Sequence, residues 1–191
     1  DGRRMLVRRG GRSVAGINRR GLETALPQPI LAAALALPGG DFLLDGEAVG
    51  DMLHAFDLLE SPDGELRDKS YAVRLTELTR LFGAYAGSSF DIVPTVHGAS
   101  AKRAFVQGLK TSDREGAVFK DLRARWTEGR PASGGSAIKC KFWASCSCLV
   151  SGINNRRSIV VALDGRPVGS VTIPPNHRMP LVGRVVEVRY L

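Results

Sequence analysis

Two apolar stretches of the chain carry charged side chains that suit phosphate chemistry. The first runs from Glu115, which precedes a glycine, to Lys120. About twenty residues later the second carries Lys139 and Lys141, whose side chains share one face if the stretch is a strand. Charged groups on buried strands are costly unless an anion or a metal ion lies between them. The pattern therefore favours a phosphate site with a metal ion. An edge strand with solvated lysines is the alternative.

The composition indicates a globular protein with a polyanionic partner. The chain has 191 residues, a formal net charge of +8 and 24% charged residues. Only six of the 27 basic residues are lysines. Because arginine binds phosphate through two parallel hydrogen bonds, this bias favours a phosphate-rich partner, the alternative being a compositional preference for arginine.

Cysteine usage and hydropathy bear on the cellular compartment. The three cysteines, Cys140, Cys146 and Cys148, are odd in number and lack CxxC spacing. This predicts a reducing compartment and disfavours a disulfide framework or a zinc site. There is no signal peptide and no apolar run of membrane-spanning length, so we expect a cytoplasmic protein that does not contact a membrane. Both ends of the chain look truncated.

Periodicity and turn residues predict an α+β fold. Predicted strands cover 5–9, 13–20, 42–49, 53–59, 91–97, 114–120 and 137–142, and predicted helices cover 30–37, 71–85 and 100–109. In the last helix Ala101, Phe105, Val106 and Leu109 are expected to face inward. Shorter strands at 149–154, 158–164, 168–173 and 185–191 predict a small barrel and a domain boundary near residue 145.

The first predicted hairpin is strongly basic, and the strands that follow contain acids. Its arginines are Arg3, Arg4, Arg8, Arg9, Arg19 and Arg20. Asp45 and Asp57 lie within apolar stretches and need partners if they are buried. A ribose hydroxyl or a basic residue of the first hairpin would serve. The alternative is a turn acid at Asp45 and a strand-end acid at Asp57.

Taken in order, these motifs resemble those of the ATP-dependent DNA ligases, within the covalent nucleotidyltransferases that include RNA ligases and mRNA capping enzymes. The matching residues are Asp1, Gly2 and Arg4 for the tail of Lys-x-Asp-Gly-x-Arg, Arg19-Arg20-Gly21 for Arg-x-Gly, Asp45-Gly46-Glu47, Phe56-Asp57, Glu115-Gly116 with Val118 and Lys120, and Lys139-x-Lys141. Each motif is weak alone, and their order makes the resemblance specific.

The resemblance implies a two-domain fold. It predicts a nucleotidyltransferase (adenylation) domain of antiparallel sheets with flanking helices at 1–145, followed by an OB-fold β-barrel domain at 146–191. It also implies roles for seven of the matching residues.

Four of these residues would contact the nucleotide. Arg4 would shape the phosphate end of the site, and Arg19 would contact the nucleotide or the 5′-phosphate. Glu47 would accept a ribose hydroxyl, and Phe56 would stack on adenine. Glu115 would hold the catalytic metal with Glu47 as a further metal ligand, and Lys139 and Lys141 would bind the α-phosphate.

The implied activity is the sealing of 5′-phosphate/3′-hydroxyl nicks in duplex DNA through lysyl-AMP and DNA-adenylate intermediates. It would use ATP and Mg²⁺ or another divalent metal, and would act as a monomer on nicked duplex DNA. The nucleophilic lysine is expected two positions before Asp1, outside this sequence. An RNA ligase or capping-type enzyme is one alternative. A non-catalytic nucleic-acid-binding relative that lacks the lysine is another.

Overall fold

The computed structural model describes residues 2–83, 85, 87, 89–129 and 135–191. Asp1, which matches the first motif, lies outside the described residues. The chain forms two compact units. One takes the chain up to Lys102 together with Val118–Ile138, and the other contains Arg103–Ala117 and Lys139–Leu191. The predicted domain boundary near residue 145 falls inside a strand of the second unit and stays a prediction.

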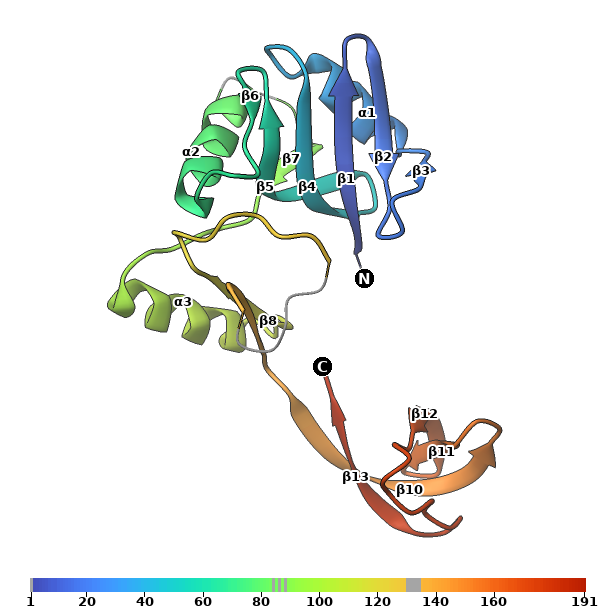
Figure 1. The fold of residues 1–191 in the computed structure, drawn as a ribbon. Helices are drawn as coiled ribbons and strands as arrows, with labels where there is room; N and C mark the ends of the chain where they lie inside the picture. Colours follow the sequence, from blue (N-terminus) through green and yellow to red (C-terminus); the bar gives the residue numbers. More distant parts are fainter. Residues whose placement is uncertain (1, 84, 86, 88, 130–134) are drawn as a thin grey trace. The chain divides into compact units, whose positions relative to one another are not determined.

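The first unit is built on a seven-stranded sheet (Figure 1). Its strands are β1 (Arg3–Gly10), β2 (Ser13–Ile17), β3 (Glu23–Thr24), β4 (Phe42–Val49), β5 (Met52–Ser61), β6 (Gly64–Glu65) and β7 (Phe90–Ile92). Neighbouring strands follow the order β3-β2-β1-β4-β5-β6, and β7 pairs with β5 in parallel. The β1–β2 hairpin is confirmed, with Gly11 at positive φ in its turn. The strand predicted at 91–97 is shorter than expected because Pro94 lacks an N–H donor.

Two helices pack on this sheet around one apolar core. They are α1 (Gln28–Ala36) and α2 (Tyr71–Phe82). Ser70 caps α2 through the N–H of Val73, and its apolar stripe buries Leu78 and Leu81. The helix predicted to Tyr85 ends at Phe82, where Gly83 follows. The core joins α1, α2 and the central strands through Ile30, Phe42, Leu44, Leu53, Leu58 and Leu78.

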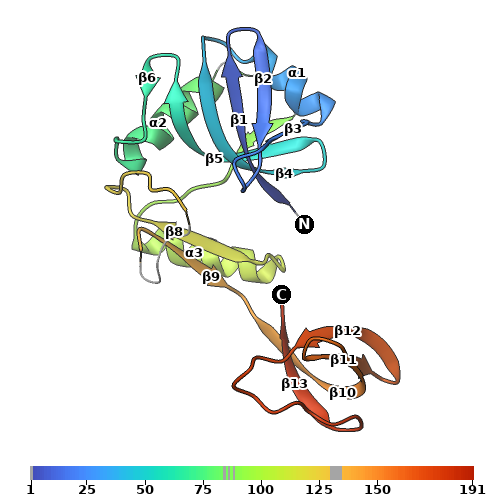
Figure 2. The same ribbon diagram turned by 45° about the vertical axis from the view of Figure 1, so that its right-hand side comes forward.

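The second unit contains a smaller antiparallel sheet in the order β12-β11-β10-β13 (Figure 2). Its strands are β10 (Ala144–Asn154), β11 (Ser158–Leu163), β12 (Arg166–Thr172) and β13 (Val185–Tyr190). All four predicted strands are confirmed, and a core of Cys148, Val150, Ile159 and Val161 lies beneath them. The described pairings leave β12 and β13 as edges, so they amount to an open sheet rather than a closed barrel.

The chain passes between the units along α3 (Ala99–Thr111) and along a two-stranded sheet of β8 (Gly116–Lys120) and β9 (Ala137–Lys141). Of the residues predicted to face inward in α3, Phe105, Val106 and Leu109 are half-buried and lie on the less exposed side of the helix, whereas Ala101 is exposed. No residue of α3 is fully buried. The helix joins neither apolar core, so its apolar side stays partly exposed. Each helix that the structure describes is too short or too polar to span a bilayer.

Arg9 has a structural role that its place in a basic hairpin did not predict. The side chain is 7% exposed and its guanidinium donates to the carbonyl oxygens of Ala34, Leu37, Gly39 and Gly40. These are the carbonyls at and just after the end of α1, which have no partner within the helix. Arg9 therefore closes α1 onto the sheet and is not free to bind a polyanion.

Replacing Arg9 by methionine is predicted to destabilise the first unit by about 2–4 kcal/mol, since it leaves buried carbonyls unpaired. Urea unfolding followed by the fluorescence of Trp126, in a W143F background, measures this loss. R12M, in the exposed turn of the same hairpin, is the control and should change stability by less than about 0.5 kcal/mol. Equal effects of R9M and R12M would contradict the capping role.

Candidate active site

Asp45 lies in the middle of β4 and is 1% exposed. Arg4 on the paired strand β1 holds it with two hydrogen bonds, Nε to Oδ1 at 3.0 Å and Nη2 to Oδ2 at 2.6 Å. This bidentate pair raises the pKa of Arg4 further above its usual value. The expectation of a partner from the first hairpin is confirmed, and the turn-acid alternative is wrong.

Gly46 follows Asp45 at a break in the β4–β5 register. Asp45 pairs with Asp57 and Gly46 with Ala55, so Phe56 is an extra residue in β5. A side chain at Gly46 would crowd the His54 carbonyl oxygen, 2.8 Å from the added Cβ, and the Leu53 side chain. The glycine thus allows a β-bulge, and a bulge changes the direction in which the extra residue, here Phe56, projects from the strand. The aromatic ring predicted to stack on adenine stands on that bulge.

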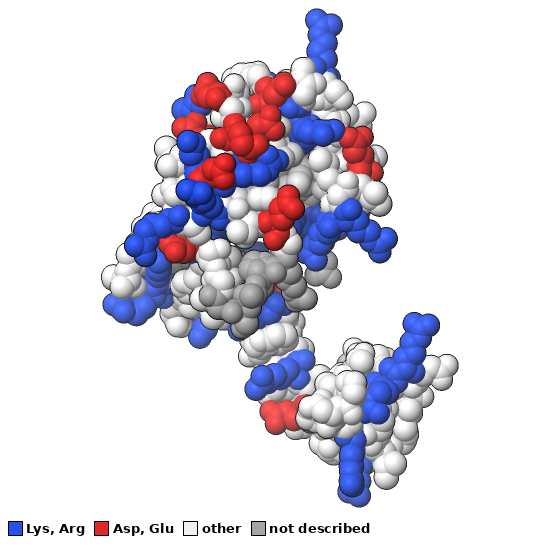
Figure 3. All heavy atoms as spheres, in the orientation of Figure 1, with Lys and Arg blue, Asp and Glu red and all other residues white. Residues whose placement is uncertain are grey.

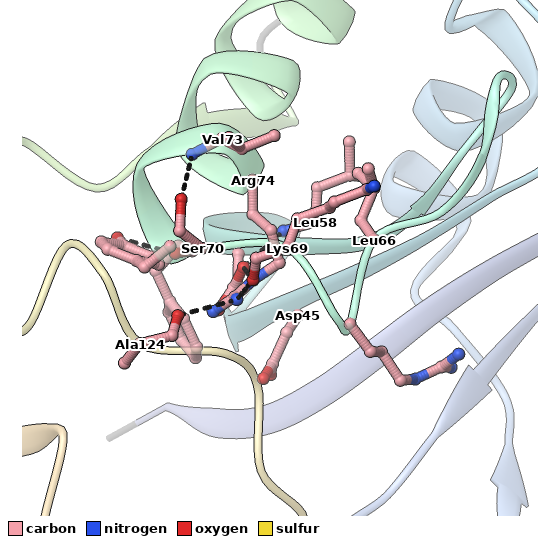
Figure 4. Close-up of polar contacts among 12 residues, drawn as sticks. Asp45, Leu58, Leu66, Lys69, Ser70, Val73, Arg74 and Ala124 are labelled. Carbon is pink, nitrogen blue, oxygen red and sulfur yellow. Dashed lines mark hydrogen bonds and ion pairs between the residues drawn. The ribbon is translucent and has the colours of Figure 1, made fainter.

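Asp57 is buried beside the bulge and is matched by Arg74 of α2. Arg74 Nε lies 2.7 Å from Oδ1 and Nη2 lies 3.0 Å from Oδ2. Its third nitrogen, Nη1, donates to the carbonyl oxygens of Lys69 at 2.7 Å and Ala124 at 3.3 Å (Figure 4). One side chain thus joins β5, the start of α2 and the segment after β8. Asp57 is buried within β5, so the strand-end alternative is wrong.

Lys120 at the end of β8 completes this cluster. Its Nζ donates to the Phe56 carbonyl oxygen at 3.1 Å, lies 4.0 Å from Asp57 Oδ2, and sits 4.1 Å from the ring centroid of Tyr71. The Tyr71 hydroxyl donates to the same carbonyl at 3.1 Å. Burial lowers the pKa of Lys120 and raises the pKa of Tyr71 to about 12. The backbone of Phe56 is therefore pinned by two donors.

Sequence reasoning did not assign Arg74 or Tyr71 to the site, and it placed Lys120 in a motif without giving it a role. One available signal was the position of Arg74 on the apolar stripe of α2, one turn before Leu78. A basic residue on such a stripe needs a buried partner. Its partner lies 17 residues earlier and could not be chosen without the fold.

Glu47 and Arg19 are exposed. Glu47 faces Arg4 across the β1–β4 pairing, and an added Cβ on Gly2 would overlap the Glu47 side chain. Gly2 thus leaves room for this carboxylate beside the Arg4–Asp45 pair. Arg19 lies in the turn after β2, and no contact of its side chain with the other predicted site residues is among those described. Their predicted roles stay predictions.

In the second unit Glu115 and Lys141 form a direct ion pair of 2.7 Å. Lys141, with a smaller contribution from Lys139, lowers the pKa of Glu115. Phe142 N–H donates to the Glu115 carbonyl oxygen at 2.9 Å, and an added Cβ on Gly116 would overlap the Cys140 carbonyl oxygen. The glycine allows the close strand approach that brings the acid to the lysine.

The expectation that these strands are buried is wrong. Glu115, Lys139 and Lys141 are exposed, as is Ile138. The charged groups are hydrated or bonded to each other, as the edge-strand alternative described. In the part of the chain that the structure describes, no three His, Cys, Asp or Glu side chains cluster as a metal site. Glu115 offers one carboxylate, which suits a Mg²⁺ ion that takes its other ligands from water and a substrate phosphate.

Positive charge is unevenly divided between the units. The sequence of the second unit carries eleven Lys and Arg against four Asp and Glu, a formal excess of seven out of +8 for the chain. On the first unit acids and bases are interspersed (Figure 3). There Arg4 and Arg8 pair with Asp45 and Glu23. Three arginines of the first hairpin, Arg4, Arg8 and Arg9, are thus engaged by groups of the protein itself, which leaves fewer of them for a polyanion than the sequence suggested.

Replacing Arg74 by methionine is predicted to lower the free energy of unfolding of the first unit by about 3–5 kcal/mol, because Asp57 becomes an unpaired buried charge. Urea unfolding followed by Trp126 fluorescence measures it in the W143F background. R80M on the same helix removes only exposed ion pairs and should leave the midpoint near that of the parent. An R74M midpoint equal to that of R80M would contradict the role of the pair.

Replacing Gly116 by alanine is predicted to separate Glu115 from Lys141, since the new Cβ cannot fit against Cys140. Losing the lysine returns the pKa of Glu115 towards its usual value, so the G116A carboxyl titrates at higher pH than the parent's. Carboxyl-carbon NMR titration of Glu115 measures the shift. G108A, in the open surface of α3, is the control. An unchanged titration in G116A would contradict the packing argument.

No protein-family model matches the sequence, and no curated protein matches it. Solved structures do match. The ligase domain of LigD from M. tuberculosis superposes with a TM-score of 0.62 at 19% identity, over 100% of this chain and 81% of that one. A mycobacterial DNA ligase D complexed with ATP gives 0.63 at 21%, over 90% and 64%. A Lig E DNA ligase gives 0.69 at 18%, over 97% and 82%. The chain therefore has the fold of DNA ligase domains.

Proposed function

We propose that this chain is the catalytic part of an ATP-dependent DNA ligase that seals 5′-phosphate/3′-hydroxyl nicks in duplex DNA. The observation that carries the proposal is the Glu115–Lys141 pair, with Lys139 on the same strand, in a chain that shares the fold of DNA ligase domains over its length. Because one fold hosts many functions, the fold alone does not specify the reaction, and the proposal depends on the charged residues.

The first unit would hold the nucleotide. Phe56 on its pinned bulge would stack on adenine, and Glu47 would accept a ribose hydroxyl. Arg4, fixed by Asp45 and 43% exposed in its side chain, would meet the phosphates. Arg19 would contact the nucleotide or the 5′-phosphate of the nick. The similarity to a DNA ligase D complexed with ATP supports this assignment.

The second unit supplies groups that suit phosphoryl transfer. Attack at phosphorus places charge on the non-bridging oxygens, and Lys139 and Lys141 would offset that charge. Glu115, whose pKa is held low, stays ionised and would hold a divalent metal. Glu47, in the first unit, is a second proposed metal ligand. A bound metal would add Lewis-acid stabilisation of the same oxygens. Lys141 would then turn from Glu115 to the phosphate.

Two further parts of the proposal concern the nucleophile and the second domain. The amine that attacks the α-phosphorus of ATP, displacing pyrophosphate, would come from a lysine two positions before Asp1.

The sheet of β10 to β13 would belong to an OB-fold domain. Its excess of positive charge would attract the DNA backbone, so binding should weaken steeply with salt. The Lig E ligase, described as binding DNA with a minimal scaffold, supports this partner.

The last chemical step tests the proposal on the chain as it exists, since it needs no lysine nucleophile. In that step the 3′-hydroxyl attacks the 5′-phosphate of a nick that already carries AMP. A new O–P bond forms, the bond to AMP breaks, and the hydroxyl proton goes to solvent. We expect the 191-residue chain with Mg²⁺ to join such a nick and release AMP.

The E115Q and K141Q variants should each join the adenylated nick about a hundred-fold or more slowly, and R80Q should join at the parent rate. Gel electrophoresis of a 5′-labelled strand measures the product. A folded parent that joins no faster than buffer with Mg²⁺ would overturn the proposal, and salt-sensitive binding without joining would indicate a non-catalytic relative. Faster joining of an RNA nick would indicate an RNA ligase.

A further inference from the structure

The second unit contains an open groove of about 590 Å³ at the junction of β9 and β10. The residues that decide its chemistry are Lys110, Lys141, Phe142, Trp143, Ser145 and Arg189. They come from α3, from the end of β9 with the link to β10, from the start of β10 and from β13. Three cations and two aromatic rings thus share one concave surface of a single unit.

Two of the three cations have no acidic partner among the described residues. The described ion pairs include neither Lys110 nor Arg189. The nearest acid to Arg189 along β13 is Glu187, and its Oε1 accepts a hydrogen bond of 2.7 Å from Ser145. Lys141 is bonded to Glu115 at 2.7 Å. The groove therefore has an uncompensated positive charge that an anion could neutralise.

The aromatic rings are interleaved with these cations. Lys110 Nζ lies 5.3 Å from the ring centroid of Phe142, and Lys141 Nζ lies 5.4 Å from that of Trp143. Trp143 is 54% exposed, which is unusual for so large an aromatic side chain in a globular unit. It belongs to neither apolar core. One face of an exposed indole is thus available to stack on a planar group.

We propose that this groove binds one phosphate and the adjoining base of an unpaired, single-stranded DNA segment. Lys110 and Arg189 would neutralise the phosphate, and Trp143 would stack on the base. Cations beside exposed aromatic rings are the combination that holds single strands. A duplex does not fit as well, because its interior bases are stacked on both faces and only its two terminal pairs offer a free face. The choice of DNA rests on the proposed function.

Fluorescence of Trp143 tests the inference directly. The chain has two tryptophans, so W126F leaves Trp143 as the only reporter. We expect 5′-phosphorylated (dT)6 to quench this emission with saturation. A long blunt duplex, in which only the terminal pairs have a free face, should quench it far less at the same nucleotide concentration, even where it binds. Free dTMP, which has the same phosphate and base, should quench only at much higher concentration, because it lacks the remaining phosphates of the strand.

Variants separate stacking from charge. In the W126F background, K110Q and R189Q should each reduce the slope of log affinity against log salt by roughly 0.7, the value for one phosphate contact with a single strand. W143L should weaken binding of fluorescein-labelled (dT)6 by roughly five- to a hundred-fold and leave that slope unchanged. R166Q, on β12 outside the groove, is the matched control and should stay within about two-fold of the parent.

Two results would overturn the inference: equal quenching by blunt duplex and (dT)6, or a W143L affinity equal to that of R166Q. The joining assay above uses a nicked duplex and is read separately. Joining without Trp143 quenching would overturn the proposal that the groove binds a single strand and would leave the ligase proposal standing. Quenching without joining would support the groove while the ligase proposal fails. Tighter binding of (rU)6 than of (dT)6 would overturn the assignment to DNA.

Discussion

Burial of Asp45 and Asp57 within one sheet is the constraint on which the candidate site depends. A carboxylate in an apolar interior requires a cation with matching geometry, and each of the two acids has its own arginine. Meeting this requirement ties β1, β4, β5 and α2 together in one arrangement. The bulge that carries Phe56 lies between the two ion pairs, so its position follows from theirs.

The candidate site residues of the two units are supported differently. In the first unit, buried ion pairs and paired donors fix the backbone from which Phe56 projects. In the second, Lys139 and Lys141 lie on an exposed strand of a two-stranded sheet and Glu115 lies directly before the other strand, and Gly116 rather than a packed core brings acid and lysine together. A backbone held by several donors suits an aromatic ring that stacks on a flat base. An exposed pair of strands suits residues that exchange one partner for another during a reaction.

Local sequence patterns predicted the secondary structure that carries the motifs. The strand 42–49 has the predicted bounds, and Asp45, Asp57, Lys139 and Lys141 lie on strands as expected, whereas Glu115 lies one residue before β8. Contacts between residues far apart in the sequence could not be predicted from local patterns. Arg9 binds carbonyls about 30 residues away, and Arg74 binds an acid 17 residues earlier. The amphipathic pattern of 100–109 predicted the helix and the side on which Phe105, Val106 and Leu109 are half-buried. It did not predict how completely that side is covered, because periodicity does not reveal which neighbouring element packs on it.

Lys141 takes part in two arrangements at once, since its single ammonium group faces both the Glu115 carboxylate and the Trp143 ring. A ligand that moves the Lys141 ammonium towards the Trp143 ring therefore weakens its ion pair with Glu115, and a ligand that moves it towards Glu115 weakens its contact with the ring. Thermodynamic linkage makes such an effect reciprocal: a strand segment that changes the affinity of Glu115 for a cation has its own affinity changed by the same factor. One amine is thereby enough to make the two sites cooperative or antagonistic.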